Sequence, residues 1–80
     1  MEPAVAILSS YEENAKWLSR NYDELKKKFN NEWVAVLRKT VIDHDGDLTK
    51  LVQRLRERHS KVYNQIAVKY VTTKELDLIL

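Results

Sequence analysis

The spacing of apolar residues predicts one strand around which the rest of the chain is arranged. The run EWVAVLR at residues 32–38 alternates so that both faces of a strand would be apolar. A helix could also contain this run, but its length of about seven residues and its β-branched centre favour a strand. We therefore predict a central strand covered on two sides, with Trp33, Ala35 and Leu37 on one face and Val34 and Val36 on the other.

Helical periodicity precedes this strand. Two capping-box patterns, at residues 10–13 and at residues 21–24, mark two helix starts with Ser10 and Asn21 as the caps. The patterns predict one helix over about residues 11–20 and another over about residues 22–29, joined by a kink or continuous with each other. Apolar residues recur at i, i+4 and i+7 through both, namely Tyr11, Ala15, Leu18, Tyr22, Leu25 and Phe29.

A hairpin and a strand–helix–strand unit follow the central strand. Residues 38–40 turn the chain, and residues 41–44 are expected to return as an antiparallel second strand. Asp45-Gly46 begins a turn, and Asp47 is the expected N-cap of a helix over residues 48–60. The run at residues 66–71 then predicts a third strand.

These elements define the expected fold. A strand–helix–strand unit has a right-handed crossover and parallel strands, so the central strand is expected to lie between them. We predict a single small α+β domain, α-β-β-α-β, whose three-stranded antiparallel sheet has the order 2-1-3 and is packed by helices. Its parts are a helical segment at residues 9–30, a core at 32–71 and an apolar tail at 72–80.

Composition limits how the fold can be stabilised and where in the cell the protein is expected. The chain has 80 residues, no cysteine and a net charge of +2, so disulfides and thiolate metal sites are excluded. A chain of this size buries only about 60–65% of its unfolded surface, so self-association is an expected source of further stability. The first eight residues lack a basic leader, and no apolar run approaches the about 18 residues of a membrane span. We expect a cytoplasmic protein without a membrane partner.

The stretch from residue 22 to residue 71 carries a family resemblance. It resembles a family of short archaeal and bacterial proteins classed as a domain of unknown function. This chain departs from the family pattern at Arg38-Lys39-Thr40, where the family has a turn that contains glycine. The resemblance implies an architecture and no catalytic activity. The residues that carry it are Tyr22, Leu25, Lys28, Phe29, Trp33-Val34-Ala35-Val36, Val41-Ile42, His44 and Asp47-Leu48.

Catalytic chemistry has few candidate residues. Asp43, His44, Asp45 and Asp47 could in principle hold a hard cation, but their spacing lacks the glycine and distal glutamate of a calcium loop. We favour a structural role in which Asp45-Gly46 turns the chain, Asp47 caps the helix and His44 ends an edge strand. His59 is expected to close the same helix at its C-terminus. Without a cysteine or an assembled triad, we expect no enzyme, no cofactor, no metal and no small-molecule substrate.

Two binding functions remain open. The first is a protein-interaction or regulatory module that acts through an apolar surface, as a homodimer or on a larger protein by helix-in-groove docking or strand addition. Its expected contact residues are Val34, Val36, Leu76, Leu78, Ile79 and Leu80. The alternative is RNA or DNA binding by one merged basic surface. That surface would consist of Lys26, Lys27, Lys28, Arg38, Lys39, Lys50, Arg54, Arg58 and Lys61.

Overall fold

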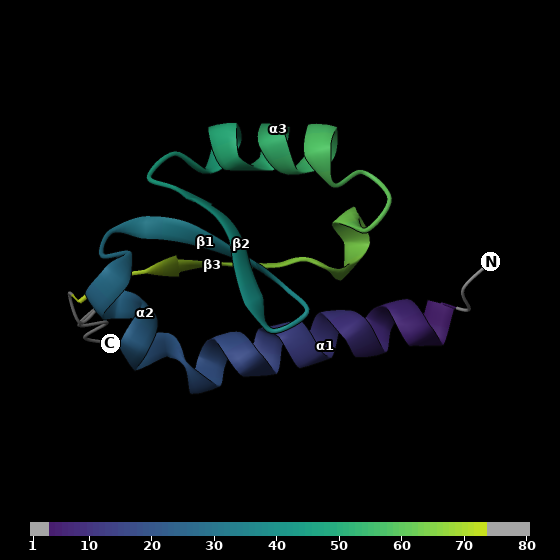
Figure 1. Cartoon of the computed structure of the whole chain (residues 1–80), viewed down its shortest axis with the longest axis horizontal. Helices are drawn as coiled ribbons and strands as arrows, with labels where there is room; N and C mark the ends of the chain where they lie inside the picture. Colours follow the sequence, from purple (N-terminus) through teal and green to yellow (C-terminus); the bar gives the residue numbers. More distant parts are fainter. Residues whose placement is uncertain (1–3, 74–80) are drawn as a thin grey trace, which may run out of the picture.

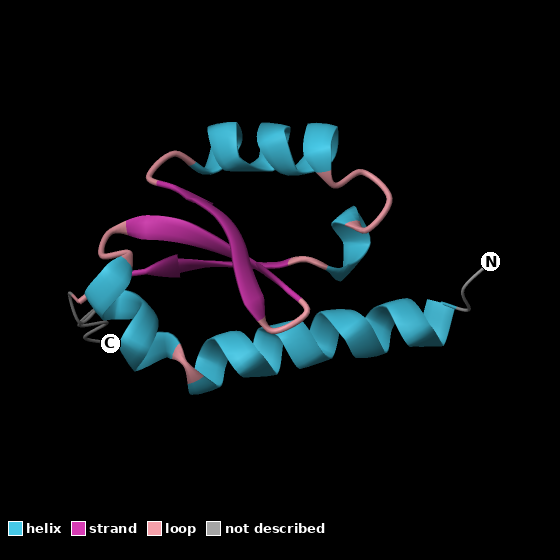
Figure 2. Cartoon of the chain, viewed as in Figure 1, coloured by secondary structure: helices cyan, strands magenta, loops and turns pink. Residues whose placement is uncertain are grey.

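Three strands form one antiparallel sheet with the Trp33 strand in the middle. In the computed structural model, which describes residues 4–73, these are β1 (Glu32–Leu37), β2 (Thr40–Asp45) and β3 (Ala67–Val71). Their order is β2-β1-β3, and both outer strands pair antiparallel to β1 (Figure 2). The α+β class, the predicted strand order and the predicted strand directions are therefore confirmed.

Helices cover both faces of this sheet. α1 (Ala4–Arg20) and α2 (Tyr22–Lys28) pack on one face, and α3 (Leu48–Arg58) packs on the other (Figure 1). The short 3-10 helix η1 (Tyr63–Gln65) connects α3 to β3. Within residues 4–73, no helix is long and apolar enough to cross a membrane.

The alternation of β1 divides the core into two layers. Val34 and Val36 are 0% exposed and pack with Leu18 and Leu25 of α1 and α2. The opposite face of β1 packs against the buried leucines of α3. The two-sided burial of β1 is confirmed. The prediction that Val34 and Val36 form a protein-interaction surface is wrong, because helices of the same chain already cover them.

The remaining predicted contact residues are Leu76, Leu78, Ile79 and Leu80. They lie outside the residues that the structure describes. Self-association through this tail therefore stays a prediction.

A bulge in β2 sets which hairpin residues share a face. Ala35 pairs with Asp43, but Val36 pairs with Val41, so Ile42 is an extra residue without an opposite partner. Residues directly opposite each other in a sheet point to the same face. The bulge therefore turns Asp43 and, two residues later, Asp45 toward α3.

The helix ends show where local sequence signals succeed and fail. Asp47 caps α3 as predicted, because its side chain accepts hydrogen bonds from the N–H groups of Thr49 and Lys50. The Ser10 prediction is wrong, since α1 begins at Ala4 and Ser10 lies inside it. Asn21 occupies the N-cap position of α2 as predicted, but its side chain donates to the Trp17 carbonyl and makes no capping hydrogen bond.

Candidate functional site

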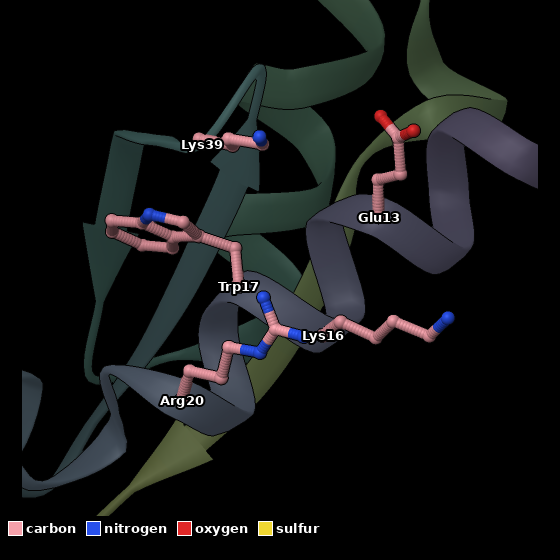
Figure 3. Close-up of a pocket in the computed structure, with 5 residues that line it drawn as sticks. All are labelled: Glu13, Lys16, Trp17, Arg20 and Lys39. Atoms are coloured by element: carbon pink, nitrogen blue, oxygen red, sulfur yellow. The ribbon is translucent and has the colours of Figure 1, made fainter.

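An open hollow lies where α1 passes beneath the tip of the β1–β2 hairpin. Its volume is about 280 Å³, and it is lined by Glu13, Lys16, Trp17 and Arg20 of α1 and by Lys39 of the hairpin (Figure 3). The four α1 residues follow i, i+3, i+4 and i+7 spacing, so one face of the helix presents them together. We call these five residues the α1–hairpin hollow.

The hairpin turn that delivers Lys39 has an unusual backbone. Arg38 and Lys39 have φ values of 53° and 59°, and the flanking residues Leu37 and Thr40 pair across the two strands. Two consecutive positive φ values in a two-residue loop define a type I′ turn, in which glycine and asparagine are preferred. This chain therefore accepts left-handed strain at two basic residues.

A buried asparagine holds the turn against α1. Asn14 is 3% exposed, and its side-chain oxygen accepts a hydrogen bond from the Lys39 backbone N–H at 3.3 Å. Its side-chain nitrogen donates to the Gln65 carbonyl at 2.8 Å. One side chain thus joins α1, the hairpin tip and η1. Sequence reasoning missed this residue, although a polar residue one turn before Leu18 within an apolar stripe was the available signal.

The tryptophan of the hollow belongs partly to the core. Trp17 is half-buried and packs against the cluster that contains Leu18 and Val34. The remainder of its indole lines the hollow, with the side chains of Lys39 and Arg20 on either side of it (Figure 3). Core packing therefore holds this aromatic ring in place while part of it remains accessible.

The positive charge of the hollow is only partly compensated. Lys16, Arg20 and Lys39 are all exposed, and none of them has an ion pair within residues 4–73. Glu13 is the one carboxylate among the five lining residues. Three cations against one carboxylate leave the α1–hairpin hollow with a positive balance that suits an anionic ligand.

The other predicted basic residues do not join into one surface. Lys26 pairs with Asp23 at 3.1 Å, and Lys27 and Lys28 lie exposed beside it on α2. The prediction that these lysines and the basic face of α3 form one continuous surface is wrong, because the sheet separates α2 from α3 (Figure 1). Lys50 and Arg58 of α3, and Lys61 after it, are exposed residues of the α3 side.

Arg54 has a structural role that the sequence pattern concealed. It donates to both carboxylate oxygens of Asp43 at 3.0 Å and to Asp45 at 2.7 Å. These hydrogen bonds hold the pKa of Asp43 below its usual 3.8. The pKa of Asp45 is lowered first by the Asp47 backbone N–H and then by Arg54. The prediction that Arg54 belongs to a nucleic-acid-binding basic surface is not supported, because its guanidinium is occupied by Asp43 and Asp45 and links α3 to β2.

Side chains also form hydrogen bonds with the backbone at both outer edges of the sheet. The backbone N–H of His44 donates to the Asp43 carboxylate at 2.8 Å, and its carbonyl accepts from Arg54 at 3.0 Å. At the other edge, the Tyr22 hydroxyl donates to the Tyr70 carbonyl and accepts from the Thr72 N–H. Side chains that bond edge groups in this way protect a sheet from pairing with another strand. The structure therefore gives strand addition no support at these points.

The acidic stretch of the hairpin does not converge on a cation site. His44 Nδ1 lies 2.8 Å from Glu32 Oε1, and its ring packs 4.6 Å from the ring of Phe29. Among residues 4–73, no three histidine, cysteine or acidic side chains are arranged to hold a metal ion. The predicted structural roles of Asp45-Gly46 and Asp47 at the turn and helix cap agree with the observed contacts.

A comparison of the sequence with known families assigns the chain to one of them. No curated protein and no solved structure matches the chain. The model of a family of unknown function, DUF5678, matches residues 24–74, which is more than half of the chain. This span contains the hairpin and Lys39, whereas the α1 residues of the hollow precede it. The chain belongs to this family of unknown function, and the predicted resemblance to a domain of unknown function is confirmed at that level.

Proposed function

We propose that this protein is a non-catalytic binding protein that holds the phosphate backbone of nucleic acid in the α1–hairpin hollow. The observation that supports the proposal is that three exposed cations, from two separate elements, line one hollow without an ion pair among the described residues. Lysine and arginine side chains on an ordinary helix face are solvated, whereas Arg20 of α1 and Lys39 of the hairpin lie beside an aromatic ring (Figure 3). A nucleic-acid ligand also agrees with the cytoplasmic location expected from the sequence.

The electrostatics of the hollow set the expected salt dependence. Each phosphate neutralised by a lysine or arginine releases condensed counterions, and the slope of log K against log salt is about −0.7 per contact for single strands. Three contacts give a slope of about −2, which corresponds to about 20-fold weaker binding between 50 mM and 200 mM salt.

A charge-reversal pair tests the location of the binding surface. The triple variant Lys16→Glu, Arg20→Glu and Lys39→Glu removes the cations of the hollow. The matched control, Lys50→Glu, Arg58→Glu and Lys61→Glu, makes the same change in net charge on the α3 side. Binding of a labelled oligonucleotide of mixed sequence is followed by fluorescence anisotropy over a series of salt concentrations.

The two variants have opposite expected outcomes. The hollow variant loses binding at every salt concentration, and the α3 variant keeps the slope of the unmodified protein. Loss of binding in the α3 variant alone would move the site to the other face of the sheet and overturn the proposal. Equal losses in both variants would show that only net charge matters.

A further inference from the structure

Building on the proposed function, we infer that the ligand of the α1–hairpin hollow is single-stranded nucleic acid, with one base stacked on the indole of Trp17. The proposed function needs only phosphate contacts, which a duplex can also make. A base stacked on Trp17 would in addition distinguish single-stranded from double-stranded nucleic acid.

The first support is the position of Trp17 relative to its neighbours. The indole lies between the α1 backbone and the hairpin tip rather than at the end of a protruding element (Figure 3). The bases of a duplex are stacked on each other, and groove edges are reached by elements that project into the groove. An aromatic ring within a hollow can stack only on a base that is turned out of a single strand.

The second support is that Tyr22 and the other tryptophan, Trp33, already have partners at their rings. Tyr22 has the Nζ atoms of Lys26 and Lys69 over its ring at 5.4 Å and 5.0 Å. Trp33, the second tryptophan, packs 5.2 Å from the ring of Tyr70. Trp17 has neither a stacked ring nor a cation over its face among the described residues. Its accessible part is therefore open to a base.

The third support is the arrangement of charge around the indole. Lys39 and Arg20 lie on either side of Trp17, and Lys16 lies farther along the same face of α1 (Figure 3). A stacked base has a phosphate on each side of it along the strand. Cations on both sides of an aromatic ring match this order, which is the combination that single-strand binding surfaces use.

Tryptophan fluorescence tests the inference directly. In a Trp33→Phe background, Trp17 is the only tryptophan, so quenching of its emission reports a base on the ring. A single-stranded oligonucleotide, the duplex of the same sequence and adenosine monophosphate are titrated separately at low salt. We expect quenching by the single strand, little quenching by the duplex and much weaker binding of the mononucleotide.

Substitution of the ring gives an independent measure. Trp17→Leu is expected to weaken single-strand binding by about 5- to 100-fold and to change duplex binding by less than about twofold, because only the stacking is lost. Trp17→Phe retains a smaller ring, so its affinity for the single strand is expected to lie between those of the unmodified protein and Trp17→Leu. If Trp17→Leu does not fold, as judged by its circular dichroism, then Trp17→Phe and the quenching experiment still decide.

The outcomes separate this inference from the function on which it rests. Equal affinity for single strand and duplex, without quenching of Trp17, would overturn the stacking while leaving the charge-dependent binding intact. Binding of the mononucleotide as tightly as the oligonucleotide would replace a strand by a small nucleotide and overturn the inference. No salt-dependent binding of any probe would overturn the proposed function itself.

Discussion

The left-handed turn at the hairpin tip determines which residue types are stable at position 39. Lys39 has φ of 59°, a conformation in which the Cβ atom of an L-residue is crowded. We expect the variant Lys39→Gly to be more stable than Lys39→Ala. Both variants remove the charge and the side chain beyond Cβ, and both keep the backbone N–H that donates to Asn14. Their difference therefore isolates the backbone conformation.

The magnitude follows from two opposing contributions. Left-handed geometry costs about 1–2 kcal/mol for a residue other than glycine. Glycine lowers the stability by about 0.4–1 kcal/mol, because it gives the unfolded chain greater conformational freedom. The net gain of Lys39→Gly over Lys39→Ala is therefore about 0.5–1 kcal/mol. For a domain of this size it corresponds to a rise in melting temperature of about 2–8 °C.

Thermal unfolding followed by circular dichroism measures this difference. Gln53 is an exposed residue in the middle of α3 and provides the control, because there the order reverses. Gln53→Gly is expected to be less stable than Gln53→Ala by about 1 kcal/mol. If Lys39→Gly is no more stable than Lys39→Ala, then the turn is not left-handed in solution and the prediction is refuted.

Four further predictions concern other contacts of the structure. Because Arg54 lowers the pKa of Asp43 below 3.8, stability is present above that pH and is lost as pH falls through the folded-state pKa. In Arg54→Met, the melting temperature should accordingly fall less steeply than in the unmodified protein as the pH is lowered from 7 to 2. Asn14→Leu leaves two backbone groups without their partner, so urea denaturation should show a loss of about 1–3 kcal/mol, and an unchanged midpoint would contradict the role of Asn14. Leu55→Ala, at a position that is 0% exposed, should cost about 2–5 kcal/mol in the same assay. If the tail self-associates, deletion of residues 76–80 should convert a dimer to a monomer in mass measurements, and a monomeric full-length chain would refute that prediction.

The architecture was predictable because its signals are short and periodic. The alternation of residues 32–38 has a period of two and is apolar on both faces, which required helices on both sides of β1. The capping of α3 by Asp47 depends on residues two and three positions away. Such signals act within one element, and burial of both faces of a central strand left few possible arrangements.

The candidate site depends on contacts between distant segments, which no local pattern contains. Asn14 bonds to Lys39 and Gln65, and the α1–hairpin hollow lies where the hairpin turn meets α1. The basic residues looked equivalent in the sequence, yet the sheet separates those of α2 from those of α3, and the β2 bulge gives Arg54 two carboxylates. The sequence by itself determined the elements and the order of the strands, because periodicity and burial act locally. The tertiary structure alone decided which charges are neutralised and which surround Trp17, because Coulomb and hydrogen-bond partners depend on distance in space.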